Sequence, residues 1–578
     1  MKDRRKRSDV VVSWSRFFWC TLVVVFTCVF ISGFTFSTFR ILFQAEKIEP
    51  VLILRWKAMP VESISGDSSV TAASISIREV IVLPDQALVF LNYPPSAQLF
   101  TKEDIACVYS SLNTSTKQKL VKKSPISVDR NEPSSQIVRC RLPPRGFAVT
   151  AGLKLEDDTP AELPVNNRWD SLAYEALIDR DNTTIVFVKG FNLRPERVSN
   201  ASKFECVYGW DFKSPKFLLR SEVISIAQEI VRCKTPLSLL SGSMRLNNSV
   251  IKVSVRMKGR GTINTIARPK PRPESEPSTR KVHEMCVCTM VRNQARFLKE
   301  WVMYHSVIGV QRWFIYDNNS NDDLDRVIES LYAHNYNITR HVWPWVKTQE
   351  AGFAHCAVRA RDTCEWVGFI DVDEFIHLPT DLLLHDVLTN QTEHNRHVAE
   401  LRTSCHSFGP SGLKRVPSKG VTVGYTCRLA IAERHKSIVK PEALNSSLIN
   451  VVHHFHLRDG FEYVNVDRGV MVINHYKYQV WEVFKDKFYR RVATYVADWQ
   501  DDQNVGSKDR APGLGTRAVE PPDWSDRFCE VTDTGLRDRV LQSFSDPLTH
   551  ILPWQKQKAH NSNNNQKTRR KIRRRGFL

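Results

Sequence analysis

The sequence lacks several features that would assign it to a common class. Its only long uncharged run lies near the N-terminus, which excludes a membrane protein with several spanning helices. No cysteine spacing is typical of zinc, which excludes a zinc-finger protein. The body of the chain also lacks a strong charge excess. Of the net charge of +20, Met1 to Arg16 carries +4 and the residues from Lys556 onward carry +9, so we expect no nucleic-acid partner.

The uncharged run extends from Phe17 to Phe39 and predicts a membrane anchor. At about 1.5 Å per residue it is long enough to cross a bilayer core of about 30 Å. A cleaved signal peptide would have a shorter apolar core, of about 7–15 residues, ending at a small-x-small site. Because basic residues precede the run, we expect a cytosolic tail (1–16), a transmembrane segment (17–39) and a lumenal stem (40–80).

Two other patterns agree with a lumenal body. The 13 cysteines of the chain permit disulfides there. Asn-x-Ser/Thr acceptor sites predict a glycoprotein, and they occur at Asn113, Asn182, Asn200, Asn247, Asn337, Asn390 and Asn445. The last residues (551–578) are strongly basic and predict a disordered tail, attracted to acidic polysaccharide.

A polar, proline-rich stretch at 258–282 predicts a linker that divides the lumenal chain. The part before it, 81–257, contains an internal duplication. Short β-branched runs separated by Pro, Asn and Ser predict two related β-sandwich-like units. The matching motifs are Cys107-Val-Tyr with Cys206-Val-Tyr, and Ile137-Val-Arg-Cys140 with Ile230-Val-Arg-Cys233. We expect the bridges Cys107–Cys140 and Cys206–Cys233, and we leave the module's role open between carbohydrate binding and a spacer.

The part after the linker, 283–550, alternates strand and helix patterns. Strands are predicted at 284–291, 311–316, 338–343 and 367–370, and helices at 294–308, from Asn321 onward and at 348–366. This order predicts the α/β fold class with a parallel, doubly wound sheet. Ligands of such sheets bind at the carboxyl ends of the strands. Arg292, Asn293, Asp317 and Asp371 each follow a predicted strand, so we expect them to converge on one cleft.

The segment Val367-Gly-Phe-Ile-Asp-Val-Asp-Glu374 carries the strongest chemical signal. An apolar strand that ends in Asp371 and Asp373 points both carboxylates the same way. Two converging carboxylates are costly unless a cation neutralises them. Paired oxygen ligands suit Mg²⁺ or Mn²⁺, typically together with substrate phosphates. The pair therefore predicts a metal–nucleotide site.

Residues 286–500 resemble glycosyltransferase family 92, whose plant members include galactan β-1,4-galactosyltransferases. The matching motifs are Cys288-Thr-Met-Val-Arg-Asn293, Glu300-Trp-Val-Met-Tyr-His-Ser-Val-Ile-Gly309, Tyr316-Asp-Asn-Asn-Ser320, Phe369-Ile-Asp-Val-Asp-Glu-Phe375, Ser407-Phe-Gly-Pro-Ser-Gly412 and Ile473-Asn-His-Tyr476. The resemblance implies a GT-A fold, an inverting mechanism, a nucleotide-sugar donor and a divalent metal, usually Mn²⁺. It also implies a type II Golgi membrane protein. His406 and Ser407 depart from the family pattern, in which Trp often precedes the Phe-Gly motif.

The resemblance assigns roles to the residues of the cleft. Asp317 would accept hydrogen bonds from uracil or ribose, or else cap a turn. Arg292 would pair with the diphosphate, or else form a surface ion pair. Asp373, together with Asp371, would hold the metal, and His475 at the end of a predicted strand would be a third ligand. The alternatives are a ligand among His453, His454 and His456, of which alternation would place His454 and His456 on one face, or no histidine ligand at all.

The catalytic base and several other details stay open. An inverting transfer needs a carboxylate to deprotonate the acceptor hydroxyl, and Glu433 and Asp459 are both candidates. Trp343 and Trp345 would stack on a sugar or pack. At least one of the seven cysteines in 283–550 stays outside an intradomain disulfide, and Cys405 with Cys427 is a possible pair.

The sequence thus predicts a Golgi-anchored, metal-dependent inverting glycosyltransferase. The expected donor is UDP-galactose, with Mn²⁺ or Mg²⁺ as cofactor and a cell-wall polysaccharide or glycan as acceptor. One alternative is a transferase that uses another UDP-sugar. The other is a lumenal glycan-binding protein whose transferase domain is inactive.

Overall fold

The computed structural model describes part of the chain, in a single compact unit within 72–578. The described ranges are 75–92, 99–112, 120–132, 135–154, 166–193, 197–212, 218–227, 229–241, 251–270, 281–432, 434–451, 453–495 and 519–555. The expected cytosolic tail, the expected anchor at 17–39 and most of the expected stem lie outside these ranges. Across the ranges themselves, no helix combines the length and the apolar composition needed to cross a bilayer.

The first β module (residues 76–168) is a sandwich of two sheets. One sheet has the order β5-β6-β2-β1-β8 and the other β4-β3-β7. The strands are β1 (Ser76–Val82), β2 (Gln86–Asn92), β3 (Ile105–Ser111), β4 (Leu120–Lys123), β5 (Ser127–Glu132), β6 (Ser135–Arg141), β7 (Phe147–Leu153) and β8 (Asn166–Arg168). The central strands β2 and β6 are buried almost throughout, because both of their faces are covered.

The second β module (residues 172–270) is a single nine-stranded sheet. Its strands follow the order β15-β14-β11-β12-β13-β10-β9-β16, with β17 also beside β9. The strands are β9 (Leu172–Ile178), β10 (Thr183–Lys189), β11 (Phe204–Gly209), β12 (Leu219–Ala227), β13 (Ile230–Lys234), β14 (Lys252–Met257), β15 (Gly261–Thr262), β16 (Asn264–Thr265) and β17 (Pro269–Lys270). The short helices η1 (Ala201–Lys203) and α2 (Leu237–Leu240) complete it.

The expected disulfides of the modules are confirmed, and the expected linker is partly wrong. Cys107–Cys140 and Cys206–Cys233 are both present, each joining strands of one module. Residues 258–270 are not linker, because β15 pairs with β14 and both β16 and β17 pair with β9. Backbone hydrogen bonding to the sheet outweighs the proline-rich composition at this point. The stretch 271–280 lies outside the described residues.

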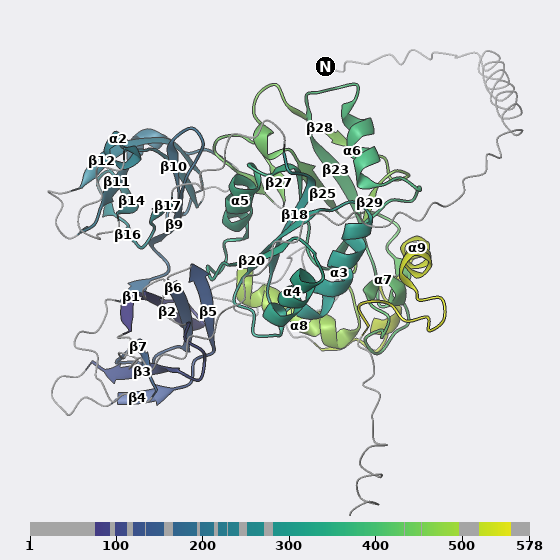
Figure 1. Cartoon of the computed structure of the whole chain (residues 1–578), viewed down its shortest axis with the longest axis horizontal. Coiled ribbons are helices and arrows are strands. Elements are labelled where there is room, and N and C mark those ends of the chain that lie inside the picture. Colours follow the sequence, from purple (N-terminus) through teal and green to yellow (C-terminus); the bar gives the residue numbers. More distant parts are fainter. Residues whose placement is uncertain are drawn as a thin grey trace, which may run out of the picture. The chain divides into compact units, whose positions relative to one another are not determined.

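The α/β domain (residues 283–555) begins with four parallel strands in the order β20-β19-β18-β21. The successive elements are β18 (His283–Val291), α3 (Ala295–Val307), β19 (Arg312–Asp317), α4 (Leu324–Ala333), β20 (Ile338–Val342), α5 (Gln349–Ala360) and β21 (Cys364–Phe369). The three helices connect the strands (Figure 1). The predicted alternation is confirmed here, although α5 ends six residues before the predicted Trp366. The residues from Cys364 onward form β21 instead.

The other half of the sheet differs from the expected doubly wound pattern. It continues from β21 in the order β25-β23-β29-β22, and β28 pairs with β23. β25 runs antiparallel to both β21 and β23, and β22 runs antiparallel to β29. The strands are β22 (Glu374–His377), β23 (Val398–Ser407), β25 (Arg434–Val439), β28 (Glu462–Asn465) and β29 (Val472–His475). The sheet is therefore mixed, and only its first half is parallel.

The remaining helices cover the C-terminal part of the domain. They are α6 (Leu384–Thr392), α7 (Val421–Gly424), α8 (Trp481–Tyr495) and α9 (Gly535–Phe544). The basic tail was expected to start at 551, but Leu552 is fully buried and the Trp554 indole N–H donates to the Lys419 carbonyl (3.0 Å). The buried Leu552 and the partly buried Trp554 keep 551–555 attached to the domain. The residues from Lys556 onward lie outside the described part.

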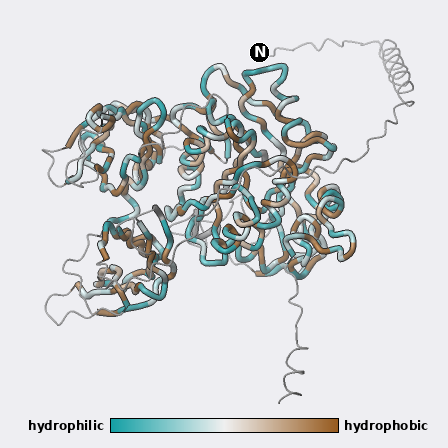
Figure 2. Tube along the Cα trace, viewed as in Figure 1, coloured by the Kyte–Doolittle hydropathy of each residue, from teal (hydrophilic) through white to brown (hydrophobic). Residues whose placement is uncertain are grey.

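Both β modules share a hydrophobic core with the α/β domain. Trp345 stacks on Phe90 of the first module and on Trp169, which precedes the second module. Phe187 packs edge-on against Trp343. Figure 2 shows the apolar residues running along the strands of all three parts. The modules are therefore part of the packing of the domain, and their role stays open between carbohydrate binding and a spacer.

Disulfides also fix the α/β domain. Cys286 and Cys288 on β18 bridge to Cys364 and Cys356. The suggested Cys405–Cys427 pair is wrong, because Cys427 bridges to Cys529. Cys405 is buried and takes part in none of the five disulfides of the described residues. The odd cysteine expected from the count is therefore Cys405.

Candidate active site

The candidate active site lies where β21 ends. After Phe369 the chain turns through Asp371 and Asp373 before β22 begins at Glu374. The Glu374 N–H donates to the Asp371 carbonyl (3.0 Å), and the Asp371 N–H donates to Oε2 of Glu374 (3.0 Å). The two aspartates therefore lie in a closed turn and not on the strand itself. The turn still holds them at the carboxyl edge of the parallel strands, as predicted.

Asp373 and His475 are brought together by strand pairing. β22 and β29 are antiparallel, with Glu374 opposite His475. Nε2 of His475 lies 3.6 Å from Oδ2 of Asp373. Burial lowers the pKa of His475 to about 4, so the imidazole is neutral near pH 7. Neutral imidazole is the form that binds a metal ion.

Lys487 on α8 contacts the same two atoms. Its ammonium donates to Oδ2 of Asp373 and lies 3.4 Å from Nε2 of His475. Burial raises the pKa of the Asp373 carboxyl, but Lys487 and His475 outweigh burial and hold this pKa well below its usual range. Asp373 is therefore a buried, charged carboxylate whose charge is balanced by a cation of the chain.

Asp371 is the more open of the two aspartates. Its side chain is 30% exposed, against 5% for Asp373. Lys436 on β25 lies 3.5 Å from Oδ2 of Asp371, and Nε2 of His453 lies 3.8 Å from it. Burial raises the pKa of Asp371, but Lys436 and then His453 outweigh burial, so the pKa is lowered and the group is charged.

Glu374 lies deeper, behind His475. Nζ of Lys436 lies 2.9 Å from its Oε1, in an ion pair, and Nδ1 of His475 is 3.6 Å from the same oxygen. Burial raises the pKa of Glu374 to about 7, although Lys436 acts in the opposite direction. A carboxylate beside the second nitrogen of a metal-binding histidine is a common arrangement, because it orients the ring.

The residues present fit a hard divalent cation. The carboxylates of Asp371 and Asp373 and the neutral imidazole of His475 are suitable ligands for Mn²⁺ or Mg²⁺. The ligand atoms of Glu374, Cys405 and His475 also lie within 4.8 Å of one another. A thiol suits softer metals, so the aspartate set fits the expected ion better. An ion bound to Asp373 and His475 would replace the Lys487 ammonium at those atoms.

The rival histidines separate in the structure. Of the three, His453 lies beside Asp371, while Nδ1 of His454 is 3.2 Å from Glu400 and His456 is exposed. The strand alternation that would place His454 and His456 on one face is not present, because only His454–Phe455 (β27) forms a strand there. These two histidines do not reach the aspartates. His453 has a positive φ of 73°, which turns it away from strand alternation.

Asp317 ends β19 as predicted, and both of its oxygens already have partners. Oδ1 accepts the Ser320 N–H (2.9 Å), which closes a turn. Oδ2 accepts from Nη2 (2.6 Å) and Nε (2.9 Å) of Arg340. The side chain is only 2% exposed. The structure thus displays the turn-capping role, and the nucleoside contact stays a prediction.

Arg292 and Asn293 occupy the loop after β18. Nη2 of Arg292 lies 3.2 Å from Oδ2 of Asp85, in the first β module, so an ion pair is present where a diphosphate contact was predicted. Asn293 has a positive φ of 53°, and its side-chain oxygen accepts the Asn321 N–H (2.6 Å). Asn293 therefore ties the loop after β18 to the loop after β19.

The two candidate bases fare differently. Asp459 is exposed and lies just before β28, whose Glu462 pairs with Val398 at the start of β23. The site lies at the other end of β23, where Ser407 pairs with His475. Nine residues of strand separate these ends, about 30 Å, so Asp459 is wrong as the base. Glu433 lies outside the described residues.

Sequence reasoning missed the two lysines of the site. Lys436 shares a strand face with the buried Ile438, two residues away, so the period of β25 could have shown that it points inward. Lys487 precedes Phe488 in the aromatic stripe of α8, and helical periodicity gives no sign that its ammonium reaches Asp373. Lysines on helices are usually solvated, which hid this one.

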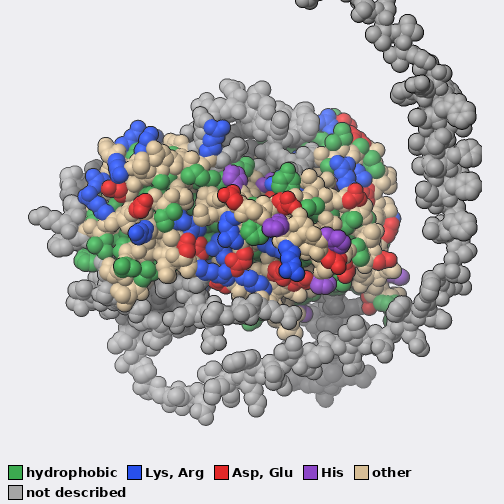
Figure 3. Space-filling model, turned by 90° about the horizontal axis from the view of Figure 1, so that it is seen from above, with side chains coloured by type: hydrophobic (Ala, Val, Ile, Leu, Met, Phe, Trp, Pro, Cys, Tyr) green, Lys and Arg blue, Asp and Glu red, His purple; other side chains and the backbone are tan. Residues whose placement is uncertain are grey.

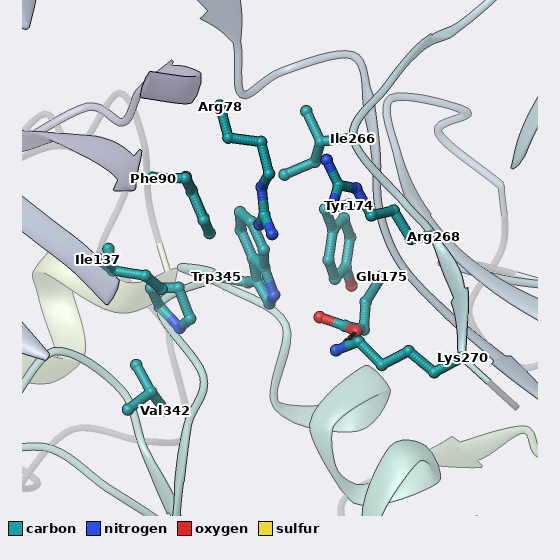
Figure 4. A pocket seen from close by; sticks show the side chains of 11 residues that line it. Arg78, Phe90, Ile137, Tyr174, Glu175, Ile266, Arg268, Lys270, Val342 and Trp345 are labelled. Carbon is teal, nitrogen blue, oxygen red and sulfur yellow. Dashed lines mark hydrogen bonds and ion pairs between the residues drawn. The ribbon is translucent and has the colours of Figure 1, made fainter. Parts of the chain in front are cut away.

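Trp345 packs rather than presenting an open face to a sugar. It is 2% exposed, and Figure 4 shows it between Phe90 and Tyr174. A small pocket opens beside it, between the β modules and the α/β domain, and Arg78 and Arg268 also line it. Of the two interpretations of this tryptophan, packing is the one observed.

On the surface, charges of both signs are mixed. The face drawn in Figure 3 carries Lys and Arg interspersed with Asp and Glu. That face shows no single basic field of the kind that binds a nucleic-acid backbone. The mixture agrees with the mild charge of the body of the chain.

Two solved structures show weak likeness. S. aureus TarS (14% identity) covers 38% of this chain and 68% of its own, with a TM-score of 0.23. The mannosyltransferase PcManGT from Pyrobaculum calidifontis, in complex with GDP-Man and Mn²⁺, is 16% identical, covers 35% of this chain and 60% of its own, and gives a TM-score of 0.22. Scores of this size are too low to support an inference about fold or function.

Sequence relatives are much closer. A protein of Ricinus communis described as a glycosyltransferase family 92 protein is 66% identical over 563 residues, which is 96% of this chain and 100% of the relative. One from Oryza sativa subsp. japonica, described likewise, is 52% identical over 528 residues, 87% of this chain and 88% of the relative. The model of glycosyltransferase family 92 matches residues 281–505, which include the aspartates, His475 and both lysines of the site. The chain therefore belongs to glycosyltransferase family 92.

Proposed function

We propose that the chain is a metal-dependent, inverting glycosyltransferase of GT-A type that acts in the Golgi lumen. The proposed donor is a UDP-sugar, with UDP-galactose first, and the acceptor is a cell-wall polysaccharide or another glycan. An N-terminal type II membrane anchor would hold it there. Family membership supports sugar transfer, while the donor, the stereochemistry, the metal and the compartment are our proposal.

One observation carries the metal and the donor. Asp373 and His475 converge within 3.6 Å at the carboxyl edge of the parallel strands, with Asp371 in the same turn. Such edges are where α/β sheets bind nucleotides. When bound, a divalent ion would neutralise the charge that develops on the leaving nucleoside diphosphate.

The chain's own residues would divide the remaining work. Asp371 and Asp373 would hold the ion, and His475 would complete the ligand set with its ring oriented by Glu374. Lys436 keeps Asp371 charged, since it offsets the effect of burial on that carboxyl. Glu433 is proposed as the base. It directly precedes β25, which begins at Arg434. In the antiparallel pairing of β25 with β21, Arg434 lies past the paired residues, on the side where β21 leads into the aspartates.

The test is donor turnover by the purified full chain. A panel of UDP-sugars is supplied with and without Mn²⁺, and transfer and hydrolysis are measured. We expect turnover of one UDP-sugar that depends on metal, a loss of about 100-fold or more in Asp373→Asn, and near wild-type turnover in Asp459→Asn. Asp459→Asn is the matched control, because it removes a carboxylate at the opposite edge of the sheet.

A glycan-binding protein with an inactive domain is the second candidate. It is favoured by the lysine ion pairs, because Lys436 and Lys487 already satisfy both aspartates without a metal. If the wild type binds neither UDP nor Mn²⁺ in calorimetry, this candidate replaces the first. Binding of both with turnover removes it.

A further inference from the structure

We infer that the repeated Ile-Val-Arg-Cys motif is an intramolecular docking motif, and that its first copy, through Arg139 and Asp129, positions the donor-side loops of the α/β domain. The inference rests on the proposed function where it concerns the donor. The docking geometry itself does not depend on it.

The first copy docks through a buried chain of charges. Nη2 of Arg139, on β6, donates to the Ser320 carbonyl of the α/β domain (2.6 Å). Nε of Arg139 lies 3.3 Å from Oδ2 of Asp129, on β5. Asp129 accepts in turn from Arg340 of the α/β domain (2.8 Å). The Arg139 and Asp129 side chains are only 4% and 7% exposed, so the contact is sealed from solvent.

The second copy uses the same chemistry. Nε of Arg232, on β13, donates to the Ser446 carbonyl (2.7 Å). Nη1 of Arg232 lies 2.9 Å from Oδ2 of Asp179, and Asp179 also accepts from Arg361 (3.0 Å). In both modules an arginine of the repeat bonds a backbone carbonyl of the α/β domain, and its aspartate partner bonds an arginine of that domain. The aspartate comes from β5 in one case and follows β9 in the other.

Both aspartates are charged in this setting. Burial raises the pKa of Asp129 and of Asp179, but the nearby arginines outweigh burial and lower both values. Removing one partner of a buried ion pair strongly destabilises the folded protein, because the remaining charge is left without compensation. The repeated arginines are therefore expected to matter about equally for stability.

The two copies differ in what they hold. Ser320, which Arg139 binds, also accepts the Asn293 N–H on its hydroxyl (3.1 Å). Arg340, which Asp129 binds, is the partner of Asp317. The first copy thus fixes the loops after β18 and β19, where the donor is proposed to bind. The second copy fixes the loop at 445–450 instead.

Arg139→Ala and Arg232→Ala form a matched pair of variants. Each removes one buried arginine of the repeat from the full chain. Hydrogen exchange is followed in peptides that cover 291–294 and 317–321, and in peptides that cover 445–450. We expect Arg139→Ala to raise exchange in the first set only, and Arg232→Ala in the second only. Unchanged exchange at 317–321 in Arg139→Ala would overturn the docking inference.

Donor binding provides the second readout. The Kd for UDP with Mn²⁺ is measured by calorimetry in both variants and in Arg139→Lys, which keeps the charge beside Asp129. We expect a Kd for UDP about fivefold or more higher in Arg139→Ala than in Arg232→Ala, with Arg139→Lys between wild type and Arg139→Ala. Equal effects of the two alanine variants would refute positioning and leave only a stability role. Failure of the wild type to bind UDP would instead refute the proposed function, and the exchange data would still decide the docking.

Discussion

The ammonium of Lys487 contacts the two atoms that a divalent ion would need as ligands, Oδ2 of Asp373 and Nε2 of His475. A metal must therefore compete with a charge that the chain itself supplies. At an effective dielectric constant of about 20, two unit charges 4 Å apart interact by about 4 kcal/mol, so removing this charge has a measurable effect.

We predict that Lys487→Gln binds Mn²⁺ more tightly than the wild type in the absence of donor, by about tenfold. The affinity is measured by calorimetry or by the electron paramagnetic resonance of free Mn²⁺. Lys485→Gln is the control, because Lys485 lies on the same helix and is exposed. Equal or weaker binding by Lys487→Gln would show that the ion does not bind at these atoms.

Glu300 is a second residue with a large predicted effect, on stability. It accepts the Val421 N–H (2.9 Å) and the Thr422 N–H (2.9 Å), and so caps α7. Burial raises its pKa to about 7, above the ordinary value of 4.5. The folded state therefore binds this proton more tightly than the unfolded state does. The associated stability is complete below pH 4.5 and is lost as the pH rises through 7.

We predict that Glu300→Gln removes this part of the pH dependence. Because one pKa unit corresponds to about 1.4 kcal/mol, the unfolding free energy of the variant relative to the wild type should rise by about 2.5 kcal/mol between pH 5 and pH 8. Denaturant unfolding at both pH values measures it. A difference between variant and wild type that does not change with pH contradicts the prediction.

At the scale of elements, the parallel half of the sheet could be predicted and the other half could not. β18, α3, β19, α4 and β20 follow from alternation of apolar strands with amphipathic stripes, which is a local pattern. The mixed half depends on pairings between distant segments, such as β22 with β29. No local period records which strands meet. For the same reason no local pattern shows that Asp459 lies at the far end of β23 from the site.

The site shows the same division. The aspartates and His475 could be predicted, because the aspartates come shortly after one apolar strand and His475 is the last residue of another. The ion-pair partners of the two lysines could not, because those partners lie 65 and 114 residues away. The bridge partners of Cys286 and Cys288 were equally out of reach, since they depend on how α5 and β21 pack on β18.

Those bridges support a prediction about α5. Cys288–Cys356 closes a separation of 68 residues and joins α5 to β18. Replacing both cysteines by alanine should reduce the unfolding free energy by about 3 kcal/mol and lower Tm by about 5 °C or more. Calorimetry of the full chain measures Tm. Cys405→Ala, which removes a buried thiol and no bridge, is the control, and a comparable loss in that variant would argue against the bridge as the cause.

At the scale of the whole molecule, the region matched by the family model shares its core with residues outside it. Trp343 and Trp345 are buried against Phe90, Trp169 and Phe187, all outside residues 281–505. A buried aromatic covers 150–250 Å². Without the modules these two tryptophans would be exposed, at a cost of several kcal/mol.

We therefore predict that residues 281–555 expressed alone melt at a lower temperature than the full chain and bind a hydrophobic dye such as ANS. Scanning calorimetry and dye fluorescence provide the measurements. If the fragment matches the full chain in Tm and stays dark with the dye, the shared core contributes little.

The contacts of Arg139 and Arg232 give the two duplicated modules separate structural roles. Although the two copies hold on by the same chemistry, each restrains a loop that the other does not touch. Loss of one copy is therefore not compensated by the other. Exchanging the two copies would preserve attachment to the α/β domain, but each loop would then contact the copy that does not normally restrain it.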